Sequence, residues 1–365
     1  MTSPTPRQLE ERLATLVDPV LGQDLVSAKC VKRLTAEDGR VRVEVTLGYP
    51  ANRRGPGLAR EIEAHLGTLP GVRSVEAVVG WKVVAHKAHK DLQPVRNVKN
   101  VIAVASGKGG VGKSTVSANL AAALAAEGAS VGMLDADIYG PSQPRMLGAS
   151  GQPETLDGKS LEPMVSHGIQ SMSIGYLIDE ETAMVWRGPM VTQALQQLLN
   201  DTNWRDVDYL IVDLPPGTGD IQLTLSQRIP VTGAVIVTTP QDIALLDARK
   251  AHKMFANEHV KIPVLGIVEN MSIHVCSNCG HAEHIFGEGG GARMAEDYGV
   301  ELLGALPLER GIREDMDGGT PTVIRDPDGM AARAFSAMAL RVAGLLSLMP
   351  KDYRQAFPSI TIGNN

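Results

Sequence analysis

Residues 107–115 read Gly-Lys-Gly-Gly-Val-Gly-Lys-Ser-Thr, a pattern typical of a phosphate-binding loop. An apolar run at 101–105 precedes it and a helical pattern over 114–126 follows, which is the context that such a loop requires. Lys113 is expected to reach the β- and γ-phosphates, and the Ser114 hydroxyl is expected to bind Mg²⁺. The residues predicted to bind nucleotide here are Gly107, Lys108, Gly109, Gly110, Val111, Gly112, Lys113, Ser114 and Thr115.

Two aspartates follow apolar runs whose ends should meet near this loop. Asp213 closes the run 208–212 and is expected to hold Mg²⁺, often through water. Asp137 is predicted to orient the attacking water, and Asp135 to support that aspartate or the metal. Aspartates at strand ends also cap the next helix, so for Asp135 the capping role stays open.

A second chemical feature is the pair Cys276 and Cys279, separated by two residues. Such a pair can bind one metal centre from a single turn, but a four-iron cluster commonly needs four thiolates. The remaining cysteine, Cys30, lies far away and is expected to be a packed apolar residue. A symmetric dimer would supply two pairs and complete four ligands.

Zinc within one chain is the competing interpretation of this cysteine pair. His274, His281 and His284 flank the thiols, so a Cys₂His₂ site is also possible by composition. A thioredoxin-like redox pair is disfavoured, because the motif does not open a helix after a first strand. Cluster and zinc both remain open from these residues alone.

The elements that must position these residues follow from the apolar pattern. Continuous apolar runs alternate with helical stretches, and this alternation predicts a doubly wound, mostly parallel α/β sheet of the P-loop NTPase kind. The runs are 101–105, 130–134, 208–212, 233–237 and 262–268, and the helical stretches are 115–126, 190–199, 243–255 and 290–298. A last helix, 330–346, is expected to pack back on the sheet.

A separate small α+β domain is predicted over residues 1–86. Its pattern indicates a first helix around Leu9 and Leu13, strands at 25–34 and 41–49, a helix at 57–66 and a strand at 72–84. The polar, basic segment 87–99 is interpreted as a solvated linker. The NTPase domain is predicted at 100–350, followed by a C-terminal tail at 351–365.

Composition narrows the class of protein. The net charge of −6 argues against a strongly basic nucleic-acid binder, and three cysteines are too few for a secreted disulfide framework. The N-terminus lacks an apolar stretch resembling a signal peptide, and no run of about 18 apolar residues is evident. We therefore expect a cytoplasmic protein with neither membrane nor nucleic acid as partner.

Four motifs together resemble the Mrp/ApbC family of iron–sulfur carrier ATPases, within the MinD-like, deviant P-loop class. They are the loop with Lys108, the stretches 135–142 and 213–220, and Cys276-x-x-Cys279, and the resemblance covers roughly 98–346. It implies that Lys108 crosses a homodimer interface to the partner's triphosphate, as an arginine finger does elsewhere. It also implies that Asn270 and Pro307 hold the base, although an asparagine at a strand end is also a common turn residue.

The first domain resembles a small iron–sulfur assembly domain. Free-standing relatives place a cysteine where the second strand turns into the helix, but residues 51–54 read Ala-Asn-Arg-Arg, so the domain is expected to recognise partners. The residues Trp186-Arg187-Gly188-Pro189 resemble a family signature to which we assign no step.

The resemblance and the residues predict an ATP-hydrolysing carrier with a [4Fe–4S] cluster at the homodimer interface. It would receive the cluster from donor proteins and transfer it to apo iron–sulfur proteins, although the loop itself presents the same phosphates for ATP and GTP. One alternative is a MinD/ParA-like positioning ATPase with a structural zinc at the cysteine pair. An electron-transfer ATPase of the nitrogenase-reductase type is disfavoured, because its cysteines lie on separate loops.

Overall fold

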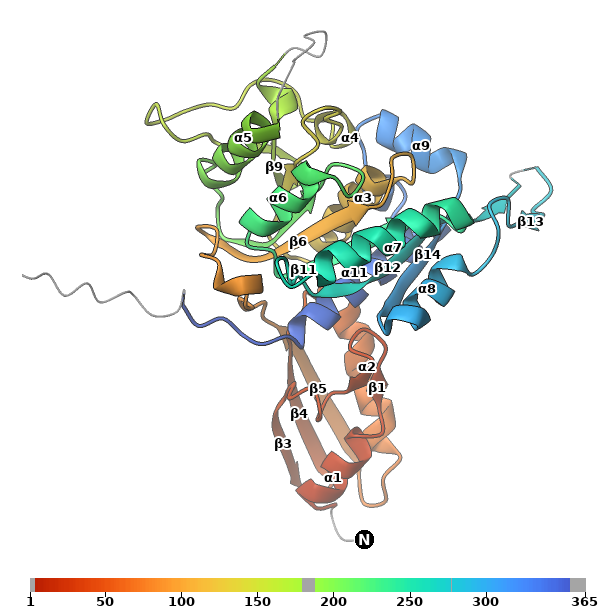
Figure 1. Ribbon diagram of the computed structural model, residues 1–365. Coiled ribbons are helices and arrows are strands. Elements are labelled where there is room, and N and C mark those ends of the chain that lie inside the picture. Colours follow the sequence, from red (N-terminus) through yellow and green to blue (C-terminus); the bar gives the residue numbers. More distant parts are fainter. Residues whose placement is uncertain (1–3, 179–187, 277, 355–365) are drawn as a thin grey trace, which may run out of the picture.

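The structure is a computed structural model that describes residues 4–178, 188–276 and 278–354. Trp186 and Arg187 of the signature motif lie outside the described residues. A nine-stranded sheet with helices on both sides forms the larger part, and a three-stranded sheet with two helices forms the smaller part below it (Figure 1).

The large sheet is mostly parallel, as the alternating apolar pattern predicts. Its core strands are β6 (Val98–Ser106), β7 (Val131–Asp135), β10 (Val207–Asp213), β11 (Gly233–Thr238) and β12 (Val264–Val275). The strand order is β13-β12-β11-β6-β10-β7-β9-β8, with β14 (Glu301–Pro307) also paired to β12. The apolar runs did not reveal β8 (Met164–Ser166), β9 (Ile169–Ser173), β13 (Ala282–Glu283) or β14.

Helices cover both faces of this sheet, and the alternation within β6 shows why. Ile102 and Val104 join the core that also contains buried residues of α3 (Lys113–Ala126) and α11 (Met330–Ser347). Ala103 and Ala105 join the opposite core, with α5, α6, α7 and α8. Those four helices span Gly188–Asn200, Asp220–Arg228, Asp242–Ala256 and Gly290–Tyr298. Short helices complete the part: α4 (Gln143–Met146), α9 (Arg310–Asp317) and α10 (Thr322–Arg325).

The last helix, α11, contradicts the expectation that the chain has no apolar run of about 18 residues. Its 18 residues are long and apolar enough to cross a membrane by length and composition, with half of that window buried inside the protein. Phe335, Met338 and Val342 are buried in the core shared with α3. Its apolar face is therefore explained by packing within this chain.

The small sheet has the order β3-β4-β5, with β3 (Val31–Glu37) antiparallel to β4 (Arg40–Leu47) and β4 parallel to β5 (Ser74–Trp81). Helices α1 (Pro6–Leu13) and α2 (Arg54–Gly67) pack on it, and the short strands β1 (Val17–Asp18) and β2 (Gln23–Asp24) pair with each other. The predicted strand at 25–34 is wrong in its first half. Asp24 Oδ1 accepts the backbone N–H groups of Val26 and Ser27, which closes a turn before β3.

The two parts share one continuous core and a hydrogen-bonded interface at the far end of α3. The backbone N–H of Asn52 donates to the Glu127 carbonyl over 3.1 Å, and the N–H of Arg53 donates to Glu127 Oε2 over 2.9 Å. Arg341 Nη1 on α11 donates to the Val20 carbonyl over 2.9 Å. The smaller part is thus anchored where α3 ends, whereas α3 begins at the phosphate-binding loop.

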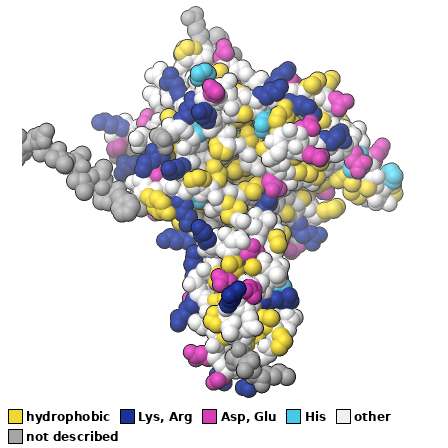
Figure 2. Space-filling view, turned by 60° about the horizontal axis from the view of Figure 1, so that its bottom comes forward, with side chains coloured by type: hydrophobic (Ala, Val, Ile, Leu, Met, Phe, Trp, Pro, Cys, Tyr) yellow, Lys and Arg dark blue, Asp and Glu magenta, His cyan; other side chains and the backbone are white. Residues whose placement is uncertain are grey.

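Residues 86–90, between the two sheets, are hydrogen-bonded to the larger part. His86 and His89 are buried; the backbone N–H of His89 donates to the Val231 carbonyl, and that of Lys87 to the Pro350 carbonyl. Lys87 and Lys90 are exposed, and Figure 2 shows basic side chains on the surface where the two parts join. The segment therefore exposes its charges while burying its histidines.

Candidate functional site

The phosphate-binding loop lies between the end of β6 and the start of α3. Gly110 and Gly112 have φ values of +81° and +80°, which favour glycine. No atom lies within 4 Å of the place where a side chain at Gly109 or Gly110 would begin, so the backbone there is open to an incoming phosphate. At Gly107 the reason is different, because a Cβ would lie 2.1 Å from the Asp247 backbone of α7.

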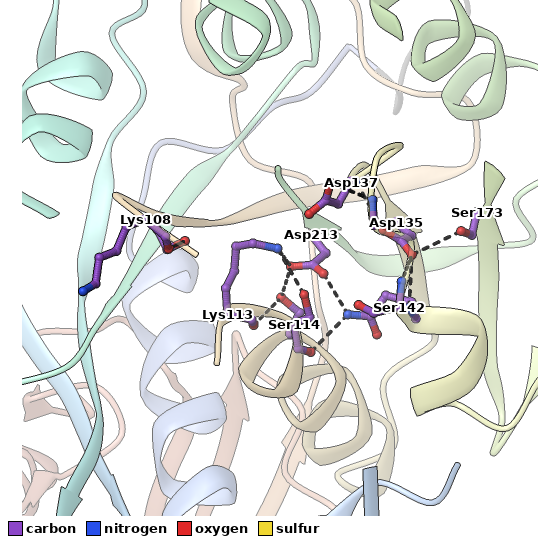
Figure 3. Close-up of polar contacts among 12 residues, drawn as sticks. Lys108, Lys113, Ser114, Asp135, Asp137, Ser142, Ser173 and Asp213 are labelled. Carbon is purple, nitrogen blue, oxygen red and sulfur yellow. Dashed lines mark hydrogen bonds and ion pairs between the residues drawn. The ribbon is translucent and has the colours of Figure 1, made fainter. Parts of the chain in front are cut away.

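Lys113 and Asp213 form a buried ion pair at the centre of the site. Lys113 Nζ lies 2.6 Å from Asp213 Oδ1 and 3.2 Å from Ser114 Oγ. Ser117, one turn further along α3, donates to the same carboxylate oxygen over 2.9 Å. The predicted phosphate-binding lysine and the predicted metal-binding aspartate and serine are therefore in direct contact (Figure 3).

The sheet register brings the two predicted acidic positions together. Asp213 and Asp135 are direct partners at the ends of the parallel strands β10 and β7, and Ser173 is the partner of Asp135 on β9. Asp135 Oδ2 accepts the backbone N–H of Ser142 over 2.9 Å and the hydroxyl of Ser173 over 3.2 Å. Burial, followed by the nearby Asp213 charge, raises the pKa of Asp135 to about 7.

Asp137 lies on the loop that follows β7 and is partly exposed. Its Oδ1 accepts the backbone N–H of Gly140 over 3.3 Å, and burial raises its pKa despite the opposing charge of Lys113. A carboxylate with a raised pKa beside a lysine is suited to holding or accepting a proton from water. Its position fits the predicted role of orienting water, which the structure does not test.

Lys108 stands apart from this group. Figure 3 shows its side chain extending away from Lys113 and the three aspartates. Its own carbonyl accepts the Ser106 hydroxyl over 2.8 Å, so the backbone at Lys108 is fixed while the side chain is partly exposed. Within one chain, Lys108 therefore adds no charge to the Lys113–Asp213 pair.

The sequence did not reveal Gln143 as part of the site. Its side chain is completely buried, and its Nε2 donates to Asp213 Oδ2 over 2.9 Å and to the Ser114 carbonyl over 3.0 Å. Gln143 follows the 135–142 stretch by one residue, but nothing in its type or spacing indicates this contact. Ser117 was also missed, although its helical spacing of four residues from Lys113 could have indicated it.

The residues present fit a nucleotide with Mg²⁺. The side-chain oxygens of Ser114 and Asp213 are the hard ligands that Mg²⁺ prefers, and they lie beside the open glycine backbone. Ser114 and Asp213 would hold the ion, directly or through water. Bound there, Mg²⁺ would neutralise charge on the phosphates.

Asn270 and Pro307 lie on the neighbouring strands β12 and β14. Asn270 Nδ2 donates to the Val111 carbonyl over 2.9 Å, which places Asn270 directly against the phosphate-binding loop. Pro307 is the partner of Ile273 across the two strands and is buried. Asn270 is therefore next to the loop, with Pro307 on the adjacent strand, and a contact of either residue with a base remains a prediction.

The cysteine pair follows the end of β12 on a hairpin completed by β13. Figure 1 shows this hairpin projecting from the edge of the larger part. The Gly280 N–H donates to the Cys276 carbonyl over 2.8 Å, and Gly280 has a φ of +74°, which closes the turn. The pKa of the Cys276 thiol is lowered by the backbone N–H groups of Asn278 and Cys279, so its thiolate is favoured.

Two of the three flanking histidines, His274 and His284, have a ring nitrogen against a backbone carbonyl. His274 Nδ1 is 2.8 Å from the Leu308 carbonyl, and His284 Nδ1 is 2.7 Å from the Ser272 carbonyl. Among residues 4–178, 188–276 and 278–354, no three His, Cys, Asp or Glu side chains gather to hold a metal ion. Cys279 is exposed and Cys276 is partly exposed, so both thiols are accessible from outside the chain.

Comparison with known proteins gives the family. The family described as NUBPL iron-transfer P-loop NTPase matches residues 97–343, and the one described as iron–sulfur cluster assembly protein matches residues 6–79. The chain is 51% identical over 335 residues to the iron–sulfur cluster carrier protein of Salmonella typhimurium, covering 92% of this chain and 90% of the relative.

Two solved structures show where the fold recurs. A nucleotide-binding protein from Archaeoglobus fulgidus, in complex with ADP, is 38% identical, with a TM-score of 0.57 over 66% of this chain and 93% of that one. The cell division ATPase MinD of Pyrococcus furiosus is 24% identical, with a TM-score of 0.51 over 67% of this chain and 99% of that one, and shares the fold. The family match over residues 97–343 and the 51% identity along 92% of the chain show that the chain belongs to the NUBPL iron-transfer P-loop NTPase family.

Proposed function

We propose that this protein is an ATP-hydrolysing carrier that holds a [4Fe–4S] cluster between two copies of the chain and delivers it to apo iron–sulfur proteins. The relative from Salmonella typhimurium is named an iron–sulfur cluster carrier protein, and its similarity extends along 92% of this chain. The cluster is cargo, supplied by donor proteins and released to recipients. ATP binding and hydrolysis would set when the two copies hold it.

The observation that carries the proposal is the course of β12. Asn270 contacts the phosphate-binding loop through the Val111 carbonyl, and Cys276 follows the end of the same strand. Five residues separate them, and β12 has an irregular register between Glu269 and Ile273, with a positive φ at Met271. A shift of the loop on nucleotide binding would thus be passed along β12 toward the thiols.

At the nucleotide site, binding requires an exchange of partners. Lys113 is paired with Asp213 in the structure. The β- and γ-phosphates would attract Lys113 away from Asp213 and leave that carboxylate to hold Mg²⁺ with the Ser114 hydroxyl. Asp137 would orient the attacking water, with Asp135 supporting the loop that carries Asp137.

The proposed mechanism needs two copies of the chain, both at the cluster site and at the nucleotide sites. Cys276 and Cys279 provide two thiolates, whereas a [4Fe–4S] cluster takes four, and a two-fold axis through the hairpins supplies the remainder. Lys108 extends away from its own site, which suits a residue that reaches the partner's triphosphate. The homodimer would therefore complete the cluster site and both nucleotide sites.

The fused domain and the location of the protein are part of the same proposal. We divide the chain into an assembly-type domain at 1–86, a connecting segment at 87–99, the NTPase domain at 100–350 and a tail at 351–365. The first domain would recognise partner proteins and not bind metal itself, because residues 51–54 carry no cysteine. Asn52 and Arg53 of this stretch contact Glu127. We expect the carrier to work in the cytoplasm without binding membrane or nucleic acid.

Reconstitution and transfer test this proposal. Anaerobically reconstituted protein is expected to hold about four irons per dimer, with the visible absorption of a cluster, and to activate an apo-enzyme that needs a [4Fe–4S] cluster. Transfer is measured with ATP, with ADP and without nucleotide, and GTP serves as the control for base preference. Stoichiometric zinc, a strictly monomeric loaded protein, or no activation under any nucleotide condition would contradict the proposal.

A further inference from the structure

One buried amide joins three parts of the nucleotide site. Gln143 Nε2 donates to the Ser114 carbonyl at the start of α3 and to Asp213 Oδ2 at the end of β10. The backbone N–H of the same residue donates to Asp135 Oδ2 over 3.0 Å. Gln143 thus ties the loop after β7 to both the phosphate-binding loop and the strand-end aspartate.

We propose that Gln143 is a positioning residue for Mg²⁺: it fixes the orientation of Asp213 and offers its own carbonyl oxygen to water on the ion. The proposal rests on the nucleotide-binding part of the proposed function and is independent of the cluster. The two acceptors around Nε2, a backbone carbonyl and a carboxylate, determine which end of the amide faces them. Nε2 therefore faces the two acceptors, and Oε1 is the amide atom that faces neither of them.

The two carboxylate oxygens of Asp213 have different partners. Oδ1 accepts from Lys113 Nζ and from the Ser117 hydroxyl, whereas Oδ2 accepts from Gln143. When Lys113 turns to the phosphates, Oδ1 loses its charged donor and becomes available to the ion. The Gln143 contact would persist and keep the carboxylate from rotating, because the uncharged Gln143 amide is not drawn to the phosphates as Lys113 is.

Gln143 Oε1, the other polar atom of the amide, differs from Nε2 in its surroundings. This atom is buried and has no hydrogen-bond partner among the described residues, although a buried amide oxygen without a partner costs free energy. It belongs to the same amide that contacts Ser114 and Asp213, the two residues that would hold Mg²⁺. A water in the shell of the ion would supply the missing donor, and such contacts to the outer shell orient the ligands.

The test separates metal binding from nucleotide binding. Binding of a fluorescent ADP analogue is measured in EDTA and then as a function of Mg²⁺, for the wild type and for Gln143→Met, which keeps the length of the side chain but loses both polar atoms. The variant is expected to need about tenfold more Mg²⁺ for half-saturation, with unchanged affinity in EDTA. Gln197→Met, at an exposed position of α5, is the matched control and should behave as the wild type.

Two outcomes would overturn the proposal. One is a Mg²⁺ curve of Gln143→Met that coincides with that of the wild type. The other is an equal loss of affinity with and without Mg²⁺, which would indicate a purely structural role. Gln143→Asn keeps the amide but is one methylene shorter, so it tests the same point if the methionine variant folds poorly, and its Mg²⁺ requirement is also expected to rise. These measurements use no cluster, so a failed transfer experiment would leave their outcome unaffected.

Discussion

Lys113 Nζ lies 2.6 Å from Asp213 Oδ1, and both side chains are buried. The lysine predicted to bind phosphate is thus neutralised by the carboxylate predicted to bind the metal. In the proposed mechanism, nucleotide and Mg²⁺ together would replace this single pair with two, lysine with phosphate and carboxylate with cation. The ion pair therefore leaves neither buried charge without a partner.

The first prediction concerns this ion pair in the absence of nucleotide. Lys113→Met or Asp213→Asn alone leaves a buried charge without its partner, so each is expected to lower the free energy of unfolding by about 3–5 kcal/mol. The double variant is expected to be more stable than the sum of the single losses predicts. Urea unfolding of the four proteins without nucleotide measures this coupling, and strictly additive losses would show that the pair does not stabilise the empty site.

The second prediction concerns Lys108, whose side chain extends away from its own site. Lys108→Ala and Asp137→Ala are each expected to bind ATP but to hydrolyse it far more slowly, by a factor on the order of 10³ if Lys108 acts like an arginine finger. When the two inactive variants are mixed, each heterodimer gains one complete site, so about a quarter of wild-type activity should return. A mixture that remains inactive, despite subunit exchange shown by a tagged copy, would indicate that Lys108 acts within its own chain.

The third prediction concerns the cysteine hairpin. Cys276→Ala removes a thiolate whose pKa is lowered by backbone N–H groups, and it is expected to abolish cluster retention while nucleotide affinity stays nearly unchanged. Cys30→Ala is the matched control, because Cys30 is buried beside β3 and should leave the iron content as in the wild type. Iron analysis after desalting, together with nucleotide binding, gives both readouts. Full iron retention in Cys276→Ala would place the cluster elsewhere.

The fourth prediction is a pH dependence of stability that arises in the segment between the two sheets. Burial lowers the pKa of His86 and of His89 below 6.5, so the unfolded chain binds protons there more readily than the folded chain. Their contribution to stability is therefore present above pH 6.5 and is lost as the pH falls below that value. Asp135, whose pKa is raised to about 7, contributes the opposite slope over this range, so the effect is measured as a difference between two proteins. In urea unfolding from pH 7.5 to 5, the wild type is expected to lose stability relative to the variant that combines His86→Gln with His89→Gln. His259→Gln, at an exposed position, should leave the slope unchanged.

The fifth prediction concerns the anchoring of the small sheet to α3. Glu127 Oε2 accepts the backbone N–H groups that begin α2, at Arg53 and Arg54. Glu127→Ala leaves these donors without a partner and is expected to cost about 1–3 kcal/mol, with faster amide exchange at both residues. Glu11→Ala removes an exposed ion pair with Arg7 and should change neither measurement. Unchanged exchange at Arg53 in Glu127→Ala would show that the contact is dispensable.

Much of the nucleotide site could be predicted because its information is local. The loop at 107–115 carries its glycines, lysines and serine in one stretch, and the apolar runs mark the strands on both sides of it. The meeting of Asp135 and Asp213 was also predictable, since the carboxyl ends of parallel strands lie at one edge of a sheet. The strand β9 was missed because its sequence, Ile-Gln-Ser-Met-Ser, is interrupted by polar residues despite its place in the sheet.

What the sequence determined by itself is the set of groups that can do chemistry: the glycine-rich loop, the strand-end aspartates and the cysteine pair. The tertiary structure decided which other residues complete them. Gln143 meets Asp213 across 70 residues, and Glu127 meets Arg53 across 74. Neither contact leaves a pattern in the sequence, because a hydrogen bond between distant segments depends on how the sheet and helices pack and not on the spacing of residues along the chain.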